Sequence, residues 1–155
     1  MGFSSLDYRR VLGSFATGIA VVTVPMRDAP PVGVTVNSFT AVSLDPPLVS
    51  FCLSRDSDRF GQFVAADEFT VNILNENQEH LSAVFARALG DVDSRDRPSA
   101  LRLPGCLAHV DCRRHAIVDA GDHVILVGAV VDLAAAATGR PLLFFRGRYE
   151  RLPPD

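Results

Sequence analysis

Residues 35 to 57 read TVNSFTAVSLDPPLVSFCLSRDS, a stretch that joins the apolar content of a buried strand pair to many small hydrogen-bonding side chains. Pro46-Pro47 in its middle cannot donate to a strand ladder, so we expect it to fix the crossing between two strands. A flat apolar ligand with a polar edge and a phosphate tail needs hydroxyls and closely approaching backbone N–H groups. Strand-end serines and threonines also cap and turn the chain, and the pattern alone favours that plainer interpretation.

The end of the stretch is a candidate anion site. Ser54 and Ser57 lie where a strand is expected to end, and a short helix capped by Asp56 or Ser57 is expected to follow. Helix N-termini attract anions, and Arg55 and Arg59 lie beside this one. The alternative for both arginines is a solvated surface position.

The rest of the chain predicts a mainly β protein with few helices. Apolar and β-branched runs predict strands at residues 19–24, 32–37, 48–54, 68–74, 106–118, 122–136 and 141–152. Helices are predicted at residues 4–18, 56–66 and 75–89, and a flexible polar loop at 90–105. Because strand and helix do not alternate regularly, the pattern favours a closed antiparallel barrel with helices outside, forming one domain over residues 1–155.

Composition and missing motifs narrow the function classes. The formal net charge is −3 without blocks of like charge, which gives no indication of nucleic-acid or membrane binding. No apolar run reaches the length of a bilayer span, and the N-terminus lacks the apolar centre of a signal peptide. Cys52, Cys106 and Cys112 contain no CxxC pair, so we expect core thiols in a reducing cytoplasm. The four histidines show no metal-site spacing, and neither a G-x-G-x-x-G nor a Walker A motif is present.

Five stretches carry a more specific signal through their order and separation. They are FATGIAVVT (15–23), GVTVNSFTAVSLDPPLVSFCL (33–53), FTVNIL (69–74), GDH (121–123) and PLLFFRGRY (141–149). Together they resemble the short-chain flavin reductases of the FMN-binding split-barrel superfamily, the reductase components of two-component flavin-dependent monooxygenases. The resemblance covers about residues 8 to 152.

This resemblance implies a fold and a set of partners. The implied fold is an antiparallel, Greek-key split β-barrel with peripheral helices, which forms a homodimer around FMN or FAD. NADH or NADPH would serve as the co-substrate. The reduced flavin would pass to a partner oxygenase, and diffusion alone could carry it there.

The resemblance also implies cofactor-binding positions. Those for the polar edge of the ring and the ribityl chain are Thr35, Val36, Asn37 and Ser38. Those beside the ring, acting largely through backbone groups, are Cys52, Leu53 and Ser54. Those for the phosphate are Ser57, with Arg55 or Arg59, closed by Phe85, Ala86 and Arg87 from the third predicted helix. Phe85 could equally belong to the core.

His123 is the candidate catalytic residue, because the resemblance places the GDH stretch on the nicotinamide side of the flavin. Its imidazole would orient the nicotinamide or help set the protonation of the flavin. Gly121 and Asp122 also suit a plain hairpin turn. Tyr149 would shape the same pocket, or simply pack with a solvated hydroxyl. The loop at 90–105 lacks the aromatic residue that many relatives carry there, so the choice between NADH and NADPH stays open.

Three other functions fit parts of the pattern. The first is a flavoenzyme of the same fold that keeps its FMN and acts directly on an organic substrate. The second is a non-catalytic module that binds flavin or haem, and the third is a small barrel without a cofactor. Oxidation of NADH or NADPH with added flavin distinguishes a reductase from the last two, and kinetics with flavin as the varied substrate distinguishes it from the first.

Overall fold

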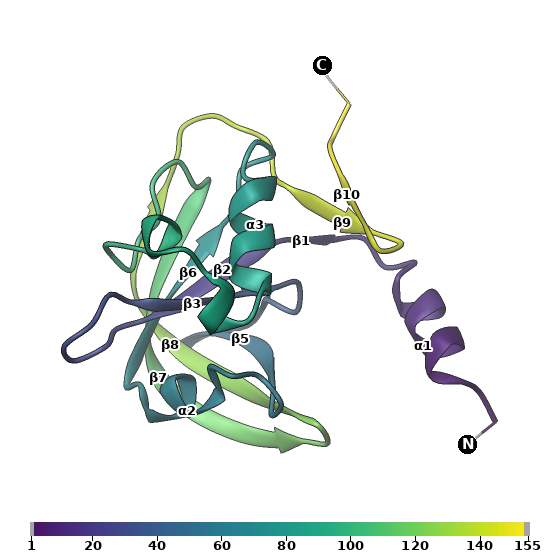
Figure 1. The fold of residues 1–155 in the computed structure, drawn as a ribbon, viewed down its shortest axis with the longest axis horizontal. Coiled ribbons are helices and arrows are strands. Elements are labelled where there is room, and N and C mark those ends of the chain that lie inside the picture. Colours follow the sequence, from purple (N-terminus) through teal and green to yellow (C-terminus); the bar gives the residue numbers. More distant parts are fainter. Residues whose placement is uncertain (1, 154–155) are drawn as a thin grey trace.

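The computed structural model describes residues 2–153 and is built mainly from antiparallel strands (Figure 1). Its main sheet has seven strands in the order β3-β2-β6-β7-β8-β5-β4. Their bounds are β2 (Ala20–Val24), β3 (Val32–Val36), β4 (Thr40–Leu44), β5 (Pro47–Ser54), β6 (Glu68–Ile73), β7 (Ala108–Ala120) and β8 (His123–Ala135). A second sheet of three short strands contains β1 (Thr17–Gly18), β9 (Leu143–Phe145) and β10 (Arg148–Glu150).

The main sheet curls into a barrel that strand pairing does not close. Its outermost strands are β3 and β4, so the expectation of a closed barrel is wrong and the split form is observed. β3 and β5 nevertheless lie in contact. Just beyond the end of β3, Ser38 Oγ accepts a hydrogen bond from Cys52 N of β5 at 2.9 Å. We call the line where β3 faces β5 and the residues after β5 the seam. One edge of β3 is free along the seam, since β2 occupies its other edge.

Two apolar clusters hold the sheet in place. Inside the barrel, Phe51 packs edge-on against both Phe63 and Phe69. Outside it, Val84 and Phe85 pack with Val21 and others in a second cluster. β2 is buried on both faces and therefore reads as a continuous run of apolar residues and threonine rather than as an alternation. Each fully buried side chain of this size contributes about 1.5–3 kcal/mol to folding.

The helices are shorter than the sequence predicted. Helix α1 (Ser5–Leu12) begins at the predicted cap, where Ser4 and Asp7 form a capping box, but it ends at Gly13 rather than at Gly18. Helix α3 (Glu79–Ala86) lies within the predicted range 75–89, and a 3-10 turn, η1 (Leu89–Asp91), follows it. No helix of residues 2–153 is long and apolar enough to cross a lipid bilayer.

Strand β4 was missed by the sequence analysis. It pairs with β5 in a hairpin whose turn holds Asp45 and Pro46, so Pro46-Pro47 turns a hairpin rather than fixing a crossing between more distant strands. β4 is an edge strand, and its Val42 and Leu44 are exposed. The third predicted C-terminal strand, at 141–152, is in fact the hairpin of β9 and β10.

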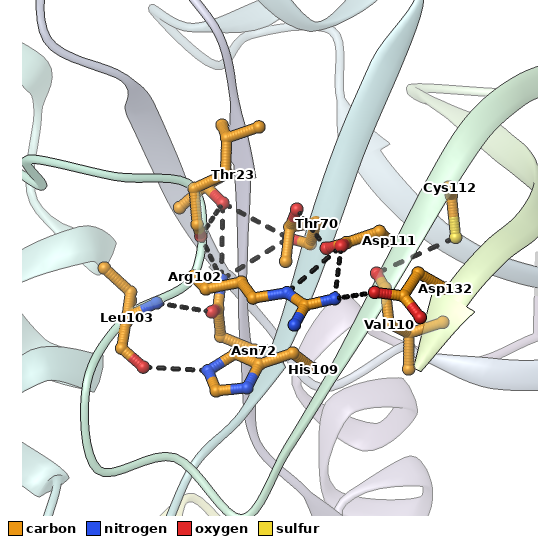
Figure 2. A network of polar contacts seen from close by, with 11 residues as sticks. Thr23, Thr70, Asn72, Arg102, Leu103, His109, Val110, Asp111, Cys112 and Asp132 are labelled. Atoms are coloured by element: carbon orange, nitrogen blue, oxygen red, sulfur yellow. Dashed lines mark hydrogen bonds and ion pairs between the residues drawn. The ribbon is translucent and has the colours of Figure 1, made fainter. Parts of the chain in front are cut away.

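The polar segment at 90–105 is anchored to the sheet (Figure 2). Beyond η1 and a second 3-10 turn, η2 (Ser94–Asp96), it runs over β6, where the Asn72 side chain accepts a hydrogen bond from Leu103 N at 2.8 Å and donates to Leu101 O at 3.1 Å. Arg102 reaches across to Asp111 and Asp132 on neighbouring strands. The segment that the sequence predicted to be a flexible loop is thus tied to the sheet by backbone groups of Leu101 and Leu103 and by the side chain of Arg102.

Candidate active site

A cleft of about 260 Å³ lies in the seam and gathers most of the predicted site. From the β3 side and the residues that follow it come Val34, Thr35, Val36, Asn37 and Ser38; from β5 and beyond come Cys52, Leu53, Ser54 and Ser57; from β8 comes His123. Val34 is the one lining residue that the sequence analysis did not name. These residues meet because β3 and β5 face each other across the seam and because His123 pairs with Ser54 in the sheet.

The hydroxyl groups around the cleft differ in how far hydrogen bonds within the chain already use them. Ser38 Oγ is held by Cys52 N, and Thr35 Oγ1 donates to Ser82 O at 2.7 Å, so Thr35 offers the cleft chiefly its backbone. Ser54 Oγ accepts from Asp56 N at 3.2 Å, and Ser57 Oγ accepts from Arg59 N at 3.3 Å. Both serines act here as acceptors and therefore keep their O–H hydrogen for an anionic ligand.

The observed helix N-terminus differs from the expected one in its cap, and the helix differs in its length. Helix α2 (Phe60–Ala65) has only six residues, and its N-cap is Arg59, which makes no side-chain cap hydrogen bond. The expectation that Asp56 or Ser57 caps this helix is therefore wrong. The short turn after β5 brings Ser57 back toward the cleft without the aligned peptide dipoles of a longer helix.

His123 stands at the start of β8, beside the turn that joins β7 to β8. Its Nδ1 lies 2.7 Å from Asp122 Oδ1, and the hydrogen bond to His123 lowers the pKa of the Asp122 carboxyl. Gly121 adopts a φ of 69°, which favours glycine at this turn. With Nδ1 engaged by Asp122, the Nε2 atom is left for a ligand in the cleft.

Arg55 holds the same hairpin rather than lining the cleft. Its backbone N–H donates to Asp122 O at 2.9 Å, its Nε donates to Gly121 O at 3.3 Å, and its guanidinium pairs with Asp119. These contacts tie the residue after Ser54 to the turn that carries His123. Arg55 therefore helps to fix the position of His123.

Besides Arg55, five predicted residues lie outside the cleft of a single chain. Arg59 and Phe85 are buried around a second, smaller cavity, while Ala86 and Arg87 are exposed at the end of α3. Tyr149 contacts Ser82 instead, with 2.9 Å between their hydroxyl oxygens. The resemblance implied these residues, but their contacts depend on the packing of α3 and of the C-terminal hairpin.

The cleft suits a flat ring with hydrogen-bonding edges and an anionic tail. The free edge of β3 presents unpaired backbone N–H and C=O groups of the kind that such a ring requires. The serine hydroxyls at the far end suit a phosphate. The residues present therefore fit a flavin in the seam.

Fold and cleft together define a split-barrel protein whose seam holds a cleft that suits such a ring. The chain belongs to the family described as the flavin reductase like domain, whose model matches residues 12–153. This confirms the resemblance seen in the sequence, and with it a split-barrel oxidoreductase that acts on flavin with a nicotinamide nucleotide.

Named relatives agree with the family. The chain is 43% identical to the FMN reductase (NADH) SmoA of Agrobacterium fabrum, over 97% of this chain and 87% of that protein. It is 42% identical to HsaB of Mycobacterium tuberculosis, a flavin-dependent monooxygenase reductase subunit, over 96% of this chain and 82% of HsaB. The solved structure of the NADH:FAD oxidoreductase SgcE6 of Streptomyces globisporus superposes with a TM-score of 0.89 at 34% identity, covering 99% of this chain and 96% of SgcE6.

Proposed function

We propose that this chain reduces FMN or FAD with NADH and releases the reduced flavin to an oxygenase component. The observation that carries the proposal is the seam cleft, where residues far apart in the sequence, from Thr35 to His123, surround one space. The relatives described as an NADH-dependent FMN reductase and a monooxygenase reductase subunit support both the nucleotide and the recipient. The free thiols of Cys52, Cys106 and Cys112 suit the reducing cytoplasm in which we place it.

The protein's own part in the reaction is binding and orientation. The edge of β3 from Thr35 to Ser38 would hold the polar side of the ring, and Cys52 and Leu53 would pack beside it. Ser54 and Ser57 would donate to the phosphate through their free O–H hydrogens. When bound, the flavin supplies the hydride-accepting chemistry. The residues lining the cleft include no acid–base cluster, and none is needed, because holding two reactants in contact supplies much of the rate.

His123 would orient the nicotinamide through Nε2. Asp122 fixes the ring by its contact with Nδ1, and Arg55 fixes the turn beneath it. A positioned hydrogen-bond donor or acceptor at this point aligns the nicotinamide over the flavin without itself taking part in hydride transfer.

The same cleft suits a flavin that leaves after each turnover. Its predicted contacts are hydroxyls and backbone groups, and no arginine lines it. Without an arginine, the phosphate would have no bidentate, fully charged partner in the cleft, so moderate affinity is expected. A flavin used as a substrate and handed to an oxygenase requires such moderate affinity.

We further propose that the chain works as a homodimer. Helix α1 projects away from the barrel (Figure 1), and none of its residues is buried. Its apolar side chains Leu6, Val11 and Leu12 are 76%, 64% and 53% exposed, and Phe15 beyond it is 78% exposed. An exposed apolar surface of this kind is typical of a subunit interface. Sedimentation analysis should therefore give twice the mass of one chain.

The test of the flavin site is a double substitution, Ser54→Ala with Ser57→Ala. We expect flavin affinity in a fluorescence titration to fall by about 100-fold or more, because two hydrogen bonds to a charged phosphate contribute about 1.5–3 kcal/mol each. Ser99→Ala, at an exposed position outside the cleft, is the matched control. Unchanged affinity for both FMN and FAD in a folded double variant would refute the assignment.

The test of His123 separates binding from reduction. In His123→Ala we expect NADH-dependent flavin reduction, followed by stopped-flow absorbance, to slow by about 10-fold or more while flavin affinity changes by less than about threefold. Equal loss of flavin binding and of reduction would count against the proposed role, since it would place His123 on the flavin rather than on the nicotinamide.

A further inference from the structure

Thr35 lines the cleft, but its hydroxyl group holds β3 against helix α3. Its Oγ1 donates to Ser82 O of α3 at 2.7 Å. Gly33, two residues earlier, lies on the same face of β3. A Cβ atom at Gly33 would lie only 2.9 Å from Cδ1 of Phe85, so α3 packs closely against this face of β3 at two points that are three residues apart in the helix.

The free edge of β3 is the part of the proposed flavin site that the sheet supports least. β2 pairs with one edge of β3, and no strand of the described residues pairs with the other. Hydrogen bonds of side chains therefore help to decide where this edge lies. Just beyond the strand, Ser38 Oγ is held by Cys52 N, and within the strand Thr35 is held by Ser82.

Ser82 is held in turn by the C-terminal hairpin of β9 and β10. Ser82 is fully buried, and its Oγ lies 2.9 Å from the hydroxyl oxygen of Tyr149. Among the described residues, no other group forms a hydrogen bond with this Oγ. α3 has only eight residues and no side-chain cap hydrogen bond at Gln78, so its position depends on contacts with the rest of the chain.

The hairpin that carries Tyr149 is anchored at several points. The Tyr149 ring packs edge-on against Phe144, with 5.8 Å between the ring centroids, and both rings pack against the second apolar cluster. β9 pairs with β1, and Arg146 N at the hairpin turn donates to Gly13 O at the end of α1 at 2.8 Å. The Tyr149 hydroxyl is therefore presented to α3 by a fixed element.

From these contacts we propose that Tyr149 is a positioning residue for the flavin site, which acts through Ser82 and Thr35 from outside the cleft. We call these three residues the linkage. The proposal rests on the proposed function, because it takes the edge from Thr35 to Ser38 to bind the polar side of the flavin ring. The hydroxyl groups of Tyr149 and Thr35 act as one unit, since Tyr149 fixes Ser82 and Ser82 fixes Thr35.

Removal of the Tyr149 hydroxyl leaves a buried polar group behind. In Tyr149→Phe the Oγ of Ser82 loses its partner, and a buried hydroxyl without a partner is costly. Movement of α3 that brings Ser82 to water or to another partner relieves this cost. Because Ser82 O holds Thr35, such movement displaces the backbone that lines the cleft.

A double-mutant cycle on flavin affinity tests the linkage. Tyr149→Phe and Thr35→Val each remove one hydroxyl with little change of shape. We expect each to weaken flavin binding in a fluorescence titration by about fivefold, the factor that one net hydrogen bond represents. The double variant should bind flavin no more than about twofold more weakly than either single variant, because the linkage is already broken. Tyr8→Phe, at the other tyrosine of the chain, exposed on α1, is the matched control and should keep the wild-type affinity.

Urea unfolding of the flavin-free variants separates positioning from a purely structural role. A purely structural role would lower the free energy of unfolding of Tyr149→Phe without changing the flavin affinity of the folded protein. Unchanged flavin affinity in folded Tyr149→Phe would therefore overturn the proposal. Losses that multiply to about 25-fold in the double variant would also overturn it, since they would show two independent contributions.

Ser82→Ala decides the case in which Tyr149→Phe does not fold. It removes the same hydrogen bond from the other side and should weaken flavin binding by a similar factor, whereas wild-type affinity in Ser82→Ala would overturn the proposal. Each of these results leaves the proposed function intact. Failure of the wild type to bind or reduce any flavin would instead overturn the proposed function itself.

Discussion

Asn72 offers the sharpest test of how the barrel is held together, because its side chain is fully buried and connects three segments (Figure 2). Its Oδ1 accepts from Leu103 N at 2.8 Å, and its two amide hydrogens are best directed at Val21 O, 3.0 Å away, and Leu101 O, 3.1 Å away. In Asn72→Ala all three bonds are lost. The buried Leu103 N–H is left without its acceptor.

The expected cost follows from these partners. An orphaned buried donor costs about 1–3 kcal/mol, and each of the two donated bonds contributes about 1 kcal/mol. Leu101 O keeps a second donor, Thr23 Oγ1 at 2.6 Å, so its loss is the smaller one. We therefore expect the free energy of unfolding to fall by about 3–5 kcal/mol, a large share of the roughly 5–15 kcal/mol typical of a domain.

Urea unfolding of the flavin-free protein measures this change, and Asn77→Ala, at an exposed asparagine, is the control expected to change stability by less than about 0.5 kcal/mol. Hydrogen exchange at the Leu103 amide should accelerate in Asn72→Ala well before global unfolding. A loss below about 1 kcal/mol with an unchanged Leu103 amide would show that the network does not anchor the segment at 90–105.

Two further predictions concern titrating groups. Burial raises the pKa of Cys106 to about 11 and that of Cys112 to about 12. At about pH 8, Ellman's reagent should therefore label one thiol per native chain, at the partly exposed Cys52, and bound flavin should slow that labelling. Rapid labelling of all three thiols would contradict their burial. Burial raises the pKa of the Asp111 carboxyl, but the hydrogen bonds it accepts, that from Arg102 first, bring it below its usual value. The stability that the ionised Asp111 adds is present above the unfolded pKa of about 3.9 and is lost as pH falls through the folded pKa. The free energy of unfolding of Asp111→Asn should therefore depend less steeply on pH below about 4 than that of the wild type. Equal slopes for wild type and variant would exclude this contribution.

The two walls of the cleft are close in sequence as well as in space, because residues 34–38 and 52–57 flank one hairpin. Their small polar side chains marked strand ends, but that pattern alone favoured capping and turn roles, and the resemblance was needed to predict a binding site. His123 came from the resemblance alone, since its approach to Ser54 depends on the pairing of β5 with β8, which no local pattern reveals.

The second cavity could not be predicted from sequence. Arg59 looks like any surface arginine until the turn between β2 and β3 and the segment after α3 close over it. The end of the first helix was missed for a local reason, because residues 14–16 carry apolar spacing that suits a helix although Gly13 already ends it. β4 was missed because a short, largely exposed edge strand shows little apolar alternation.

The seam also determines how a product can depart. In an ordinary barrel, a molecule held between strands could leave only if a ladder of backbone hydrogen bonds were broken first. Here β3 has no neighbouring strand on one side. Among the described residues, the hydrogen bond from Cys52 N to Ser38 Oγ connects the two sides of the seam. With the flavin held in the seam as we propose, reduced flavin would leave between β3 and β5 at each cycle without the breaking of any strand pair.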